Sequence, residues 1–260
     1  MDDSQPQFLE VGAGTRRRRV AYRRRGGKGP ELLWLSGFLS DVANTKATAI
    51  AEWAAEQGLA MMRFDYSGHG LSGGDLLDAT IGDWLEESTA VWELTGEGPR
   101  IVIGSSMGGW IALLLARHLA RVRRSHELAG LVLIAPAFDM TETLMWRELP
   151  QASKDEIART GVTYVPSAYA DPYPITRHLI EEGRSHLLEG QPFDPGCPVR
   201  ILQGMRDPDV PWRHSLALVD LLAGADVELT LIKEGDHRLS APQDLKRLTA
   251  TIATLARPAG

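Results

Sequence analysis

The stretch from residue 99 to residue 116 constrains this chain most, because it joins a β-branched strand to an apolar helix through the pattern Gly-x-Ser-x-Gly. Gly104 and Gly108 stand two residues to either side of Ser106. Between a strand and a helix this spacing forms a nucleophile elbow, a strained turn in which the glycines let the two elements pass closely. The pattern therefore predicts that Ser106 is a nucleophile with an exposed hydroxyl.

Strand and helix patterns alternate around this stretch. Buried strands are expected at about 31–35, 60–64, 130–134, 199–203 and 227–232, and helices at about 44–57, 81–94, 212–223 and 241–256. The region from Phe8 to Arg25 is expected to form an edge β-hairpin. This alternation predicts an α/β fold, with a mostly parallel sheet and helices on both faces.

The alternation breaks between about residues 137 and 195, where short amphipathic pieces flank a proline-rich stretch. The 260 residues suit one large domain, so we predict a single domain, 1–260, with a small helical cap insertion at about 137–195. The cap is expected over the carboxyl edge of the sheet, where ligands bind in such folds. It is rich in aromatic residues: Phe138, Trp146, Tyr164, Tyr169, Tyr173 and Phe193.

A serine nucleophile needs a base that takes its proton and a carboxylate that orients the base. In the elbow fold these partners follow the serine in the order Asp or Glu, then His. His237 follows the predicted strand at 227–232 and is expected to be the base, and Asp207, after strand 199–203, is expected to be its carboxylate. Asp209 and Asp236 are rivals, although Asp236 adjoins the histidine and is typical of a turn residue or helix cap.

The oxyanion that forms during acyl transfer needs two preorganised donors. These are expected to be the backbone N–H groups of Met107, directly after the nucleophile, and of Phe38, in the loop after strand 31–35. Gly37 is expected to permit the backbone path of that loop. No group of His, Cys, Asp or Glu has the spacing of metal ligands, and no glycine-rich loop has the full dinucleotide pattern. Neither a metal nor a cofactor is expected.

Composition narrows the possible partners. Hydrophobic residues make up 43% of the chain and the net charge is -6, which suits a folded protein with a core and argues against nucleic acid as a partner. No apolar run reaches the roughly 18 residues of a membrane helix. The acidic first residues carry no targeting pattern, so a cytoplasmic location is expected.

Three further features have ordinary structural interpretations. The arginines between Arg16 and Arg25 are expected to form a solvated face that protects a sheet edge. His69 lies in a loop rich in Gly and Ser and is expected to hold a tight turn. Cys197, the only cysteine, is expected to be a small buried residue.

Several short strings carry a resemblance to a known family: SGFLSD at 36–41, TKA at 45–47, RFDYSG at 63–68, GSSMGGW at 104–110, GMRD at 204–207 with VPW at 210–212, and DHR at 236–238. Together with the order of the candidate residues, they resemble the α/β-hydrolase superfamily. A closer likeness is to the abhydrolase subfamily whose mitochondrial animal members are palmitoyl-protein thioesterases and acyl-glucuronide esterases. The resemblance implies the α/β-hydrolase fold and a triad of Ser106, Asp207 and His237, and it favours Asp207 over Asp209.

The resemblance also implies a serine hydrolase that cleaves acyl thioesters or carboxylic esters through a covalent acyl-enzyme. Its substrate would be a small-molecule or lipidated acyl compound, and an aromatic-rich cap suits an apolar acyl chain. Two alternatives stay open: a general carboxylesterase or acyl-glucuronide esterase, and a non-catalytic ligand-binding protein of the same fold.

Overall fold

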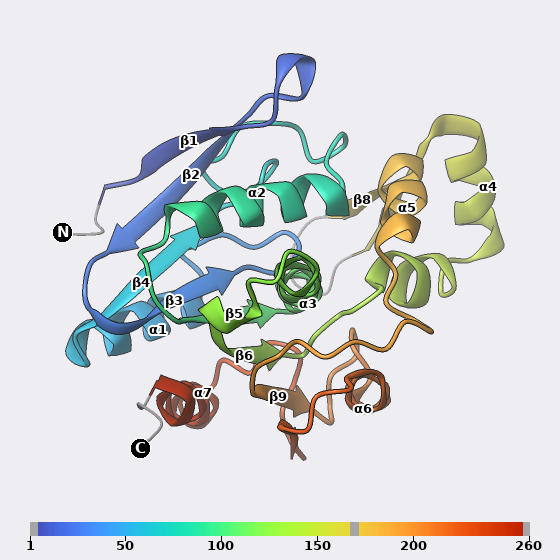
Figure 1. The fold of residues 1–260 in the computed structure, drawn as a ribbon. Coiled ribbons are helices and arrows are strands. Elements are labelled where there is room, and N and C mark those ends of the chain that lie inside the picture. The colour runs from blue at the N-terminus through green and yellow to red at the C-terminus, as the bar shows by residue number, and fades with distance from the viewer. Residues whose placement is uncertain (1–4, 167–171, 257–260) are drawn as a thin grey trace.

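The computed structural model describes residues 5–166 and 172–256, which form an eight-stranded sheet in the order β1-β2-β4-β3-β5-β6-β9-β10 (Figure 1). The bounds are β1 Gln7–Val11, β2 Arg18–Arg25, β3 Lys28–Leu35, β4 Leu59–Phe64, β5 Arg100–Ser105, β6 Leu128–Ile134, β9 Val199–Gly204 and β10 Val227–Ile232. β1 pairs antiparallel with β2, and β2 with β4, whereas all pairs from β4 to β10 are parallel. The predicted mostly parallel α/β sheet with an edge hairpin is confirmed.

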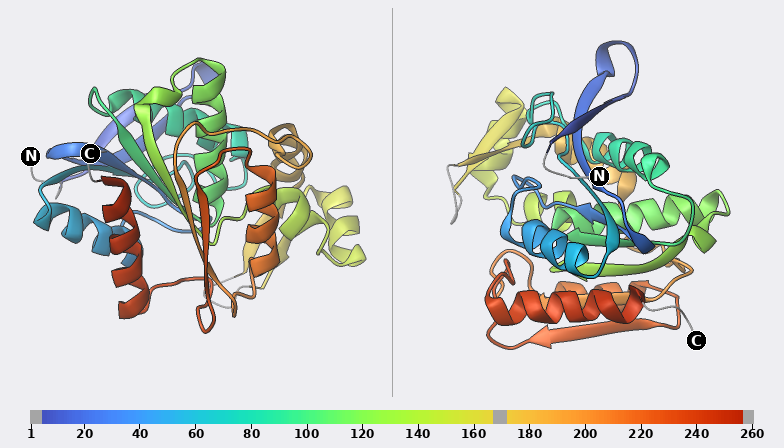
Figure 2. Two further views of the ribbon diagram at one scale, coloured as in Figure 1. Left: turned by 60° about the horizontal axis from the view of Figure 1, so that its bottom comes forward. Right: turned by 90° about the vertical axis from the view of Figure 1, so that its left-hand side faces the viewer.

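Helices cover both faces of this sheet. They are α1 Thr45–Glu56, α2 Ile81–Leu94, α3 Met107–Arg121, α6 Trp212–Leu221 and α7 Pro242–Ala256. Helices α1 and α7 pack together on one face, and α2, α3 and α6 pack on the other (Figure 2). The central strands are thus buried on both sides, as their continuous apolar sequences require.

Strand β3 illustrates how the sequence produces this arrangement. Successive side chains of a strand point to opposite faces of the sheet. Leu33 and Leu35 accordingly join the core beneath α2 and α3, whereas Leu32 and Trp34 join the core beneath α1 and α7. An apolar run without alternation therefore fits a two-sided core.

The segment between β6 and β9, which includes residues 137–195, has its own small structure. It contains a π-helical turn at Thr141–Trp146, α4 at Gln151–Thr160, a hairpin of β7 (Val162–Val165) and β8 (Tyr173–Thr176), and α5 at Arg177–Gly183. A separate apolar cluster holds it together: Leu149, Ile157, Ile175 and Ile180. The sequence predicted helices here but not the hairpin, because Pro174 favours a loop; in a two-stranded sheet an edge position tolerates proline. Tyr169 lies outside the described residues.

The prediction that the arginines form a solvated face is wrong for Arg18. Its side chain is only 10% exposed, and it contacts three carboxylates of α2. Arg18 donates to Glu87 at 2.6 Å, and the neighbouring Arg16 donates to Asp83 at 2.7 Å. These ion pairs fasten the edge hairpin to α2, so charges that look solvent-facing in the sequence are structural.

Within residues 5–166 and 172–256, no helix is both long enough and apolar enough to cross a membrane.

Candidate active site

The turn at Ser106 has the geometry that the sequence pattern predicts. Ser106 has φ 54° and ψ -118°, a conformation that is strained for a residue with a side chain. A Cβ atom on Gly104 would lie 2.3 Å from the carbonyl oxygen of Gly108, and one on Gly108 would lie 2.1 Å from that of Leu35. Both positions therefore require glycine. Ser106 is partly exposed, while the residues on either side of it are buried.

The candidate base and its carboxylate follow two neighbouring strands. Because β5, β6, β9 and β10 are parallel, the residues after them meet at one edge of the sheet. There Nδ1 of His237 lies 2.8 Å from Oδ2 of Asp207, whose carboxylate is fully buried. The amide of Gln203 also donates to this Oδ2 at 3.1 Å. The structure thus brings together the two residues that the sequence placed 30 positions apart.

The rival carboxylates have different roles. Asp236 accepts the backbone N–H of Leu239 at 2.9 Å, which is the turn role expected for it. Asp209 is exposed, but one of its carboxylate oxygens, one oxygen of Asp207 and one ring nitrogen of His237 all lie within 4.8 Å of one another. Asp209 therefore adds negative charge beside the pair formed by Asp207 and His237.

Those three groups could in principle reach one cation. However, the Asp207 carboxylate already accepts hydrogen bonds at both oxygens: from His237 and Gln203 at Oδ2, and from the backbone N–H groups of Asp209 and Val210, at 2.8 Å each, at Oδ1. A carboxylate held in this way suits the orientation of an imidazole better than the coordination of a metal.

The two candidate oxyanion donors flank Ser106. Met107 begins α3 directly after it, and Phe38 lies in the loop that follows β3. Between the loop and the serine the packing is close, because a Cβ on Gly37 would come within 3.3 Å of the Ser106 Cβ. Neighbouring N–H groups in this loop are engaged elsewhere: Leu39 donates to the ring of His69, and Ser40 donates to the carbonyl of Gly37.

The sequence did not reveal three contacts around this site. His69 bonds the Phe38 loop through Leu39. Tyr173, from the inserted hairpin, makes a T-shaped ring contact with Phe38, with the centroids 5.8 Å apart, and burial, followed by the charge of Asp209, raises its pKa. Lys46 of α1 donates to the carbonyl oxygen of Arg238, the residue after His237, at 2.5 Å. None of these contacts has a local sequence signature, since each joins segments far apart in the chain.

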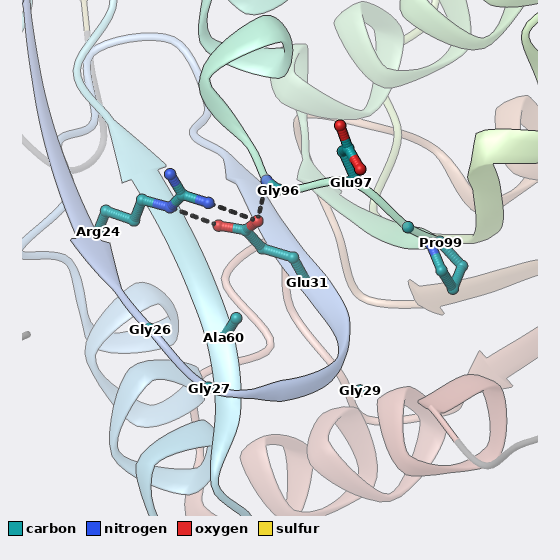
Figure 3. Close-up of a pocket in the computed structure, with 10 residues that line it drawn as sticks. Arg24, Gly26, Gly27, Gly29, Glu31, Ala60, Gly96, Glu97 and Pro99 are labelled. Atoms are coloured by element: carbon teal, nitrogen blue, oxygen red, sulfur yellow. Dashed lines mark hydrogen bonds and ion pairs between the residues drawn. The ribbon is translucent and has the colours of Figure 1, made fainter.

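Two other features lie away from this edge. Cys197 is partly rather than fully buried and packs against the core, and burial raises the pKa of its thiol to about 12. A cavity of about 380 Å³ lies at the opposite end of the strands, near the β2–β3 turn and the start of β5. Figure 3 shows Arg24 and Glu31 facing each other in it, and Glu31 also accepts the Gly96 N–H at 2.7 Å. The charges of Arg24 and Glu31 in this cavity are therefore paired with each other.

The chain is similar to several known proteins. The profile of the family described as serine aminopeptidase, S33, matches residues 32–186. The chain is 38% identical to the mitochondrial palmitoyl-protein thioesterase ABHD10 of Bos taurus over 238 residues, 91% of this chain and 76% of the relative. It is 36% identical to the protein of the same name from Homo sapiens, with the same coverage of each chain.

Solved structures agree with these matches. The crystal structure of a protein from Agrobacterium vitis S4 superposes on this chain with a TM-score of 0.93 at 43% identity, over 97% of this chain and 99% of that one. The α/β hydrolase domain-containing protein 10 from mouse superposes with a TM-score of 0.84 at 35% identity, over 97% and 98%. The esterase Est1E from Butyrivibrio proteoclasticus, at 19% identity and a TM-score of 0.67, shares the fold.

These relatives correct one expectation. The thioesterases that the chain resembles are mitochondrial proteins, so the cytoplasmic location expected from the sequence is wrong. That expectation rested on the acidic composition of a few residues, and the charge of so short a stretch does not report a compartment.

Proposed function

Because the chain belongs to the α/β-hydrolase family described as serine aminopeptidase, S33, we propose that it hydrolyses acyl thioesters or carboxylic esters through an acyl-enzyme on Ser106. The relatives and the fold make it an ester or thioester hydrolase. The observation that carries the assignment of roles is the 2.8 Å contact between His237 and the buried Asp207, at the edge of the sheet where Ser106 follows β5.

In the first half-reaction His237 takes the hydroxyl proton of Ser106, and the serine oxygen attacks the acyl carbon. Asp207 keeps the proton on Nδ1, so that Nε2 is the basic nitrogen. The N–H groups of Phe38 and Met107 would stabilise the oxyanion. When the tetrahedral species collapses, His237 gives its proton to the departing thiolate or alkoxide.

In the second half-reaction water replaces the leaving group. His237 removes a proton from water, and the resulting hydroxide attacks the acyl carbon of the serine ester. Collapse of the second tetrahedral species returns the proton to Ser106 and releases the carboxylic acid. The cycle consumes one water and needs no external oxidant or reductant.

For the substrate, we propose a long-chain acyl group, as the name of the palmitoyl-protein thioesterase relatives suggests. Residues 137–195 would act as a cap within a single domain, because Tyr173 from this segment reaches Phe38 beside the serine. Aromatic side chains over the site would bind an acyl chain by burying its apolar surface. The alternative is a general carboxylesterase or acyl-glucuronide esterase.

The test uses the full-length protein with p-nitrophenyl esters and acyl-cysteine thioesters of two to sixteen carbons. Ser106→Ala should abolish turnover, whereas Ser105→Ala, which changes the buried neighbouring serine, should retain it. A preference for long thioesters supports a depalmitoylase, and a preference for short oxygen esters supports the alternative. If the wild type shows no turnover and no labelling by a fluorophosphonate, the hydrolase proposal is wrong.

A further inference from the structure

His69 connects two loops beside the candidate oxyanion donor. Its Nε2 accepts the backbone N–H of Leu39 at 3.0 Å, and its Nδ1 lies 3.0 Å from the carbonyl oxygen of Ser67. A carbonyl oxygen only accepts hydrogen bonds, so Nδ1 carries the proton, and Nε2 of the neutral ring accepts. These partners therefore define both the tautomer and the protonation state of His69.

The ring of His69 is also held by packing. Only 6% of the residue is exposed. Its ring makes T-shaped contacts with the rings of Phe38 and Trp84, with centroids 6.0 Å and 5.6 Å away. The indole N–H of Trp84 donates to the same Ser67 carbonyl at 3.1 Å. His69 therefore cannot turn away from Leu39 without disturbing several buried contacts.

Leu39 needs such a partner. Its φ is 58°, in the left-handed region that leucine rarely adopts, and it directly follows Phe38. With 45% of its surface exposed, Leu39 has little side-chain packing to hold this conformation. Its hydrogen bond to His69 is therefore a main constraint on the peptide units around Phe38.

We propose that His69 is a positioning residue for the hydrolysis, because its acceptor nitrogen fixes the loop that presents the Phe38 N–H to the oxyanion. This inference rests on the proposed function. An oxyanion exists only in the tetrahedral species, so a misplaced donor lowers kcat more than it affects substrate binding. A displacement of about 1 Å in a reacting group can cost about 100-fold in rate.

The environment of the ring favours the accepting form. Burial lowers the pKa of His69 below its ordinary value, while the bond to Ser67 and the charge of Asp41 act in the opposite direction. Protonation would place an N–H on Nε2, facing the N–H of Leu39, and would break the contact. Burial thus keeps His69 neutral where the loop needs an acceptor.

The test is a matched pair of substitutions in the full-length protein. In His69→Gln the amide oxygen can occupy the position of Nε2 and accept from Leu39, whereas His69→Asn places its amide near Nδ1 and loses that acceptor. With a p-nitrophenyl ester, we expect kcat to fall about tenfold to 100-fold in His69→Asn with little change in KM, and to stay near wild type in His69→Gln. His126→Asn, at an exposed position, is the control.

A trifluoromethyl ketone supplies a second measurement, because it forms a tetrahedral oxyanion adduct with the serine. Its inhibition constant should rise in His69→Asn by about the factor by which kcat falls. If His69→Asn does not fold, His69→Phe, which keeps the ring packing and lacks both nitrogens, should show the same two changes.

The outcomes separate this inference from the proposed function. Wild-type kcat in His69→Asn, or equal losses in the Gln and Asn variants with a raised KM, would overturn the positioning role while leaving the hydrolase assignment intact. A wild type that neither turns over esters nor reacts with a fluorophosphonate would overturn both.

Discussion

The ring of His237 and the carboxylate of Asp207 form a pair whose geometry is set before any substrate binds. Nδ1 of His237 lies 2.8 Å from Oδ2, while the other oxygen accepts the backbone N–H groups of Asp209 and Val210. The carboxylate is fully buried, and Gln203 supplies a further donor. Hydrogen bonds within the loop after β9 therefore fix the Asp207 carboxylate, and its Oδ2 faces Nδ1 of His237.

This geometry predicts different effects for two neighbouring aspartates. Asp207→Asn should lower kcat by about 10⁴-fold, because an amide no longer enforces the tautomer of His237. Asp209→Asn should change kcat by less than about tenfold, because Asp209 is exposed and the Asp207 bond survives. Steady-state kinetics of both variants on one ester decide this. A larger loss in Asp209→Asn would mean that the roles are reversed.

The buried contact between Arg18 and Glu87 predicts a stability effect. Glu87 is fully buried and also accepts the Ser67 N–H at 2.9 Å. Arg18→Met should lower the free energy of unfolding by about 3 kcal/mol, because a carboxylate is left in the core without its charge partner. Urea denaturation measures this loss. Arg18→Met combined with Glu87→Leu should recover part of it, and a double variant no more stable than the single one would contradict the explanation.

Lys46 predicts a pH dependence of stability. Burial, followed by the charge of Arg238, lowers the pKa of Lys46 from 10.5 to about 8. Between these values the unfolded chain binds more protons than the folded one, so this group makes stability rise with pH from about 8 to 10.5. Relative to Lys46→Met, the wild type should therefore gain stability between pH 8 and pH 10, as followed by urea denaturation. Lys233→Met, at an exposed position, should give no such difference, and parallel profiles for wild type and Lys46→Met would refute the assignment.

Much of the main sheet and its helices could be predicted because the signals are local. The apolar period and the Thr80 cap give α2 the bounds expected from the sequence, and Asn44 caps α1 by accepting the Ala47 N–H at 3.0 Å. The hairpin of the inserted segment has no such signal, because its stability comes from a cluster of residues far apart in the chain. The burial of Arg18 could not be predicted for the same reason, since its partner Glu87 lies 69 residues away in the sequence.

The candidate site also combines residues with a clear sequence signal and contacts that the sequence does not show. The glycine spacing marks Ser106, and the order of the strand ends marks Asp207 and His237. The link from His69 to Leu39 could not be predicted, because a backbone N–H carries no side-chain identity and the two residues stand 30 positions apart. The structure therefore adds this main-chain contact to the sequence motif.

Tyr173 predicts how the inserted segment affects substrate choice. Its ring packs on Phe38 with the centroids 5.8 Å apart, and burial, followed by the charge of Asp209, raises its pKa. If the segment binds the acyl chain, Tyr173→Ala should raise KM for a sixteen-carbon ester about tenfold, because the variant loses about 1–3 kcal/mol of apolar contact with the chain. KM for a two-carbon ester should change less than twofold. Tyr173→Phe, which keeps the ring, should behave as wild type with both substrates. Equal changes for both chain lengths would assign Tyr173 to the support of Phe38 rather than to the acyl chain.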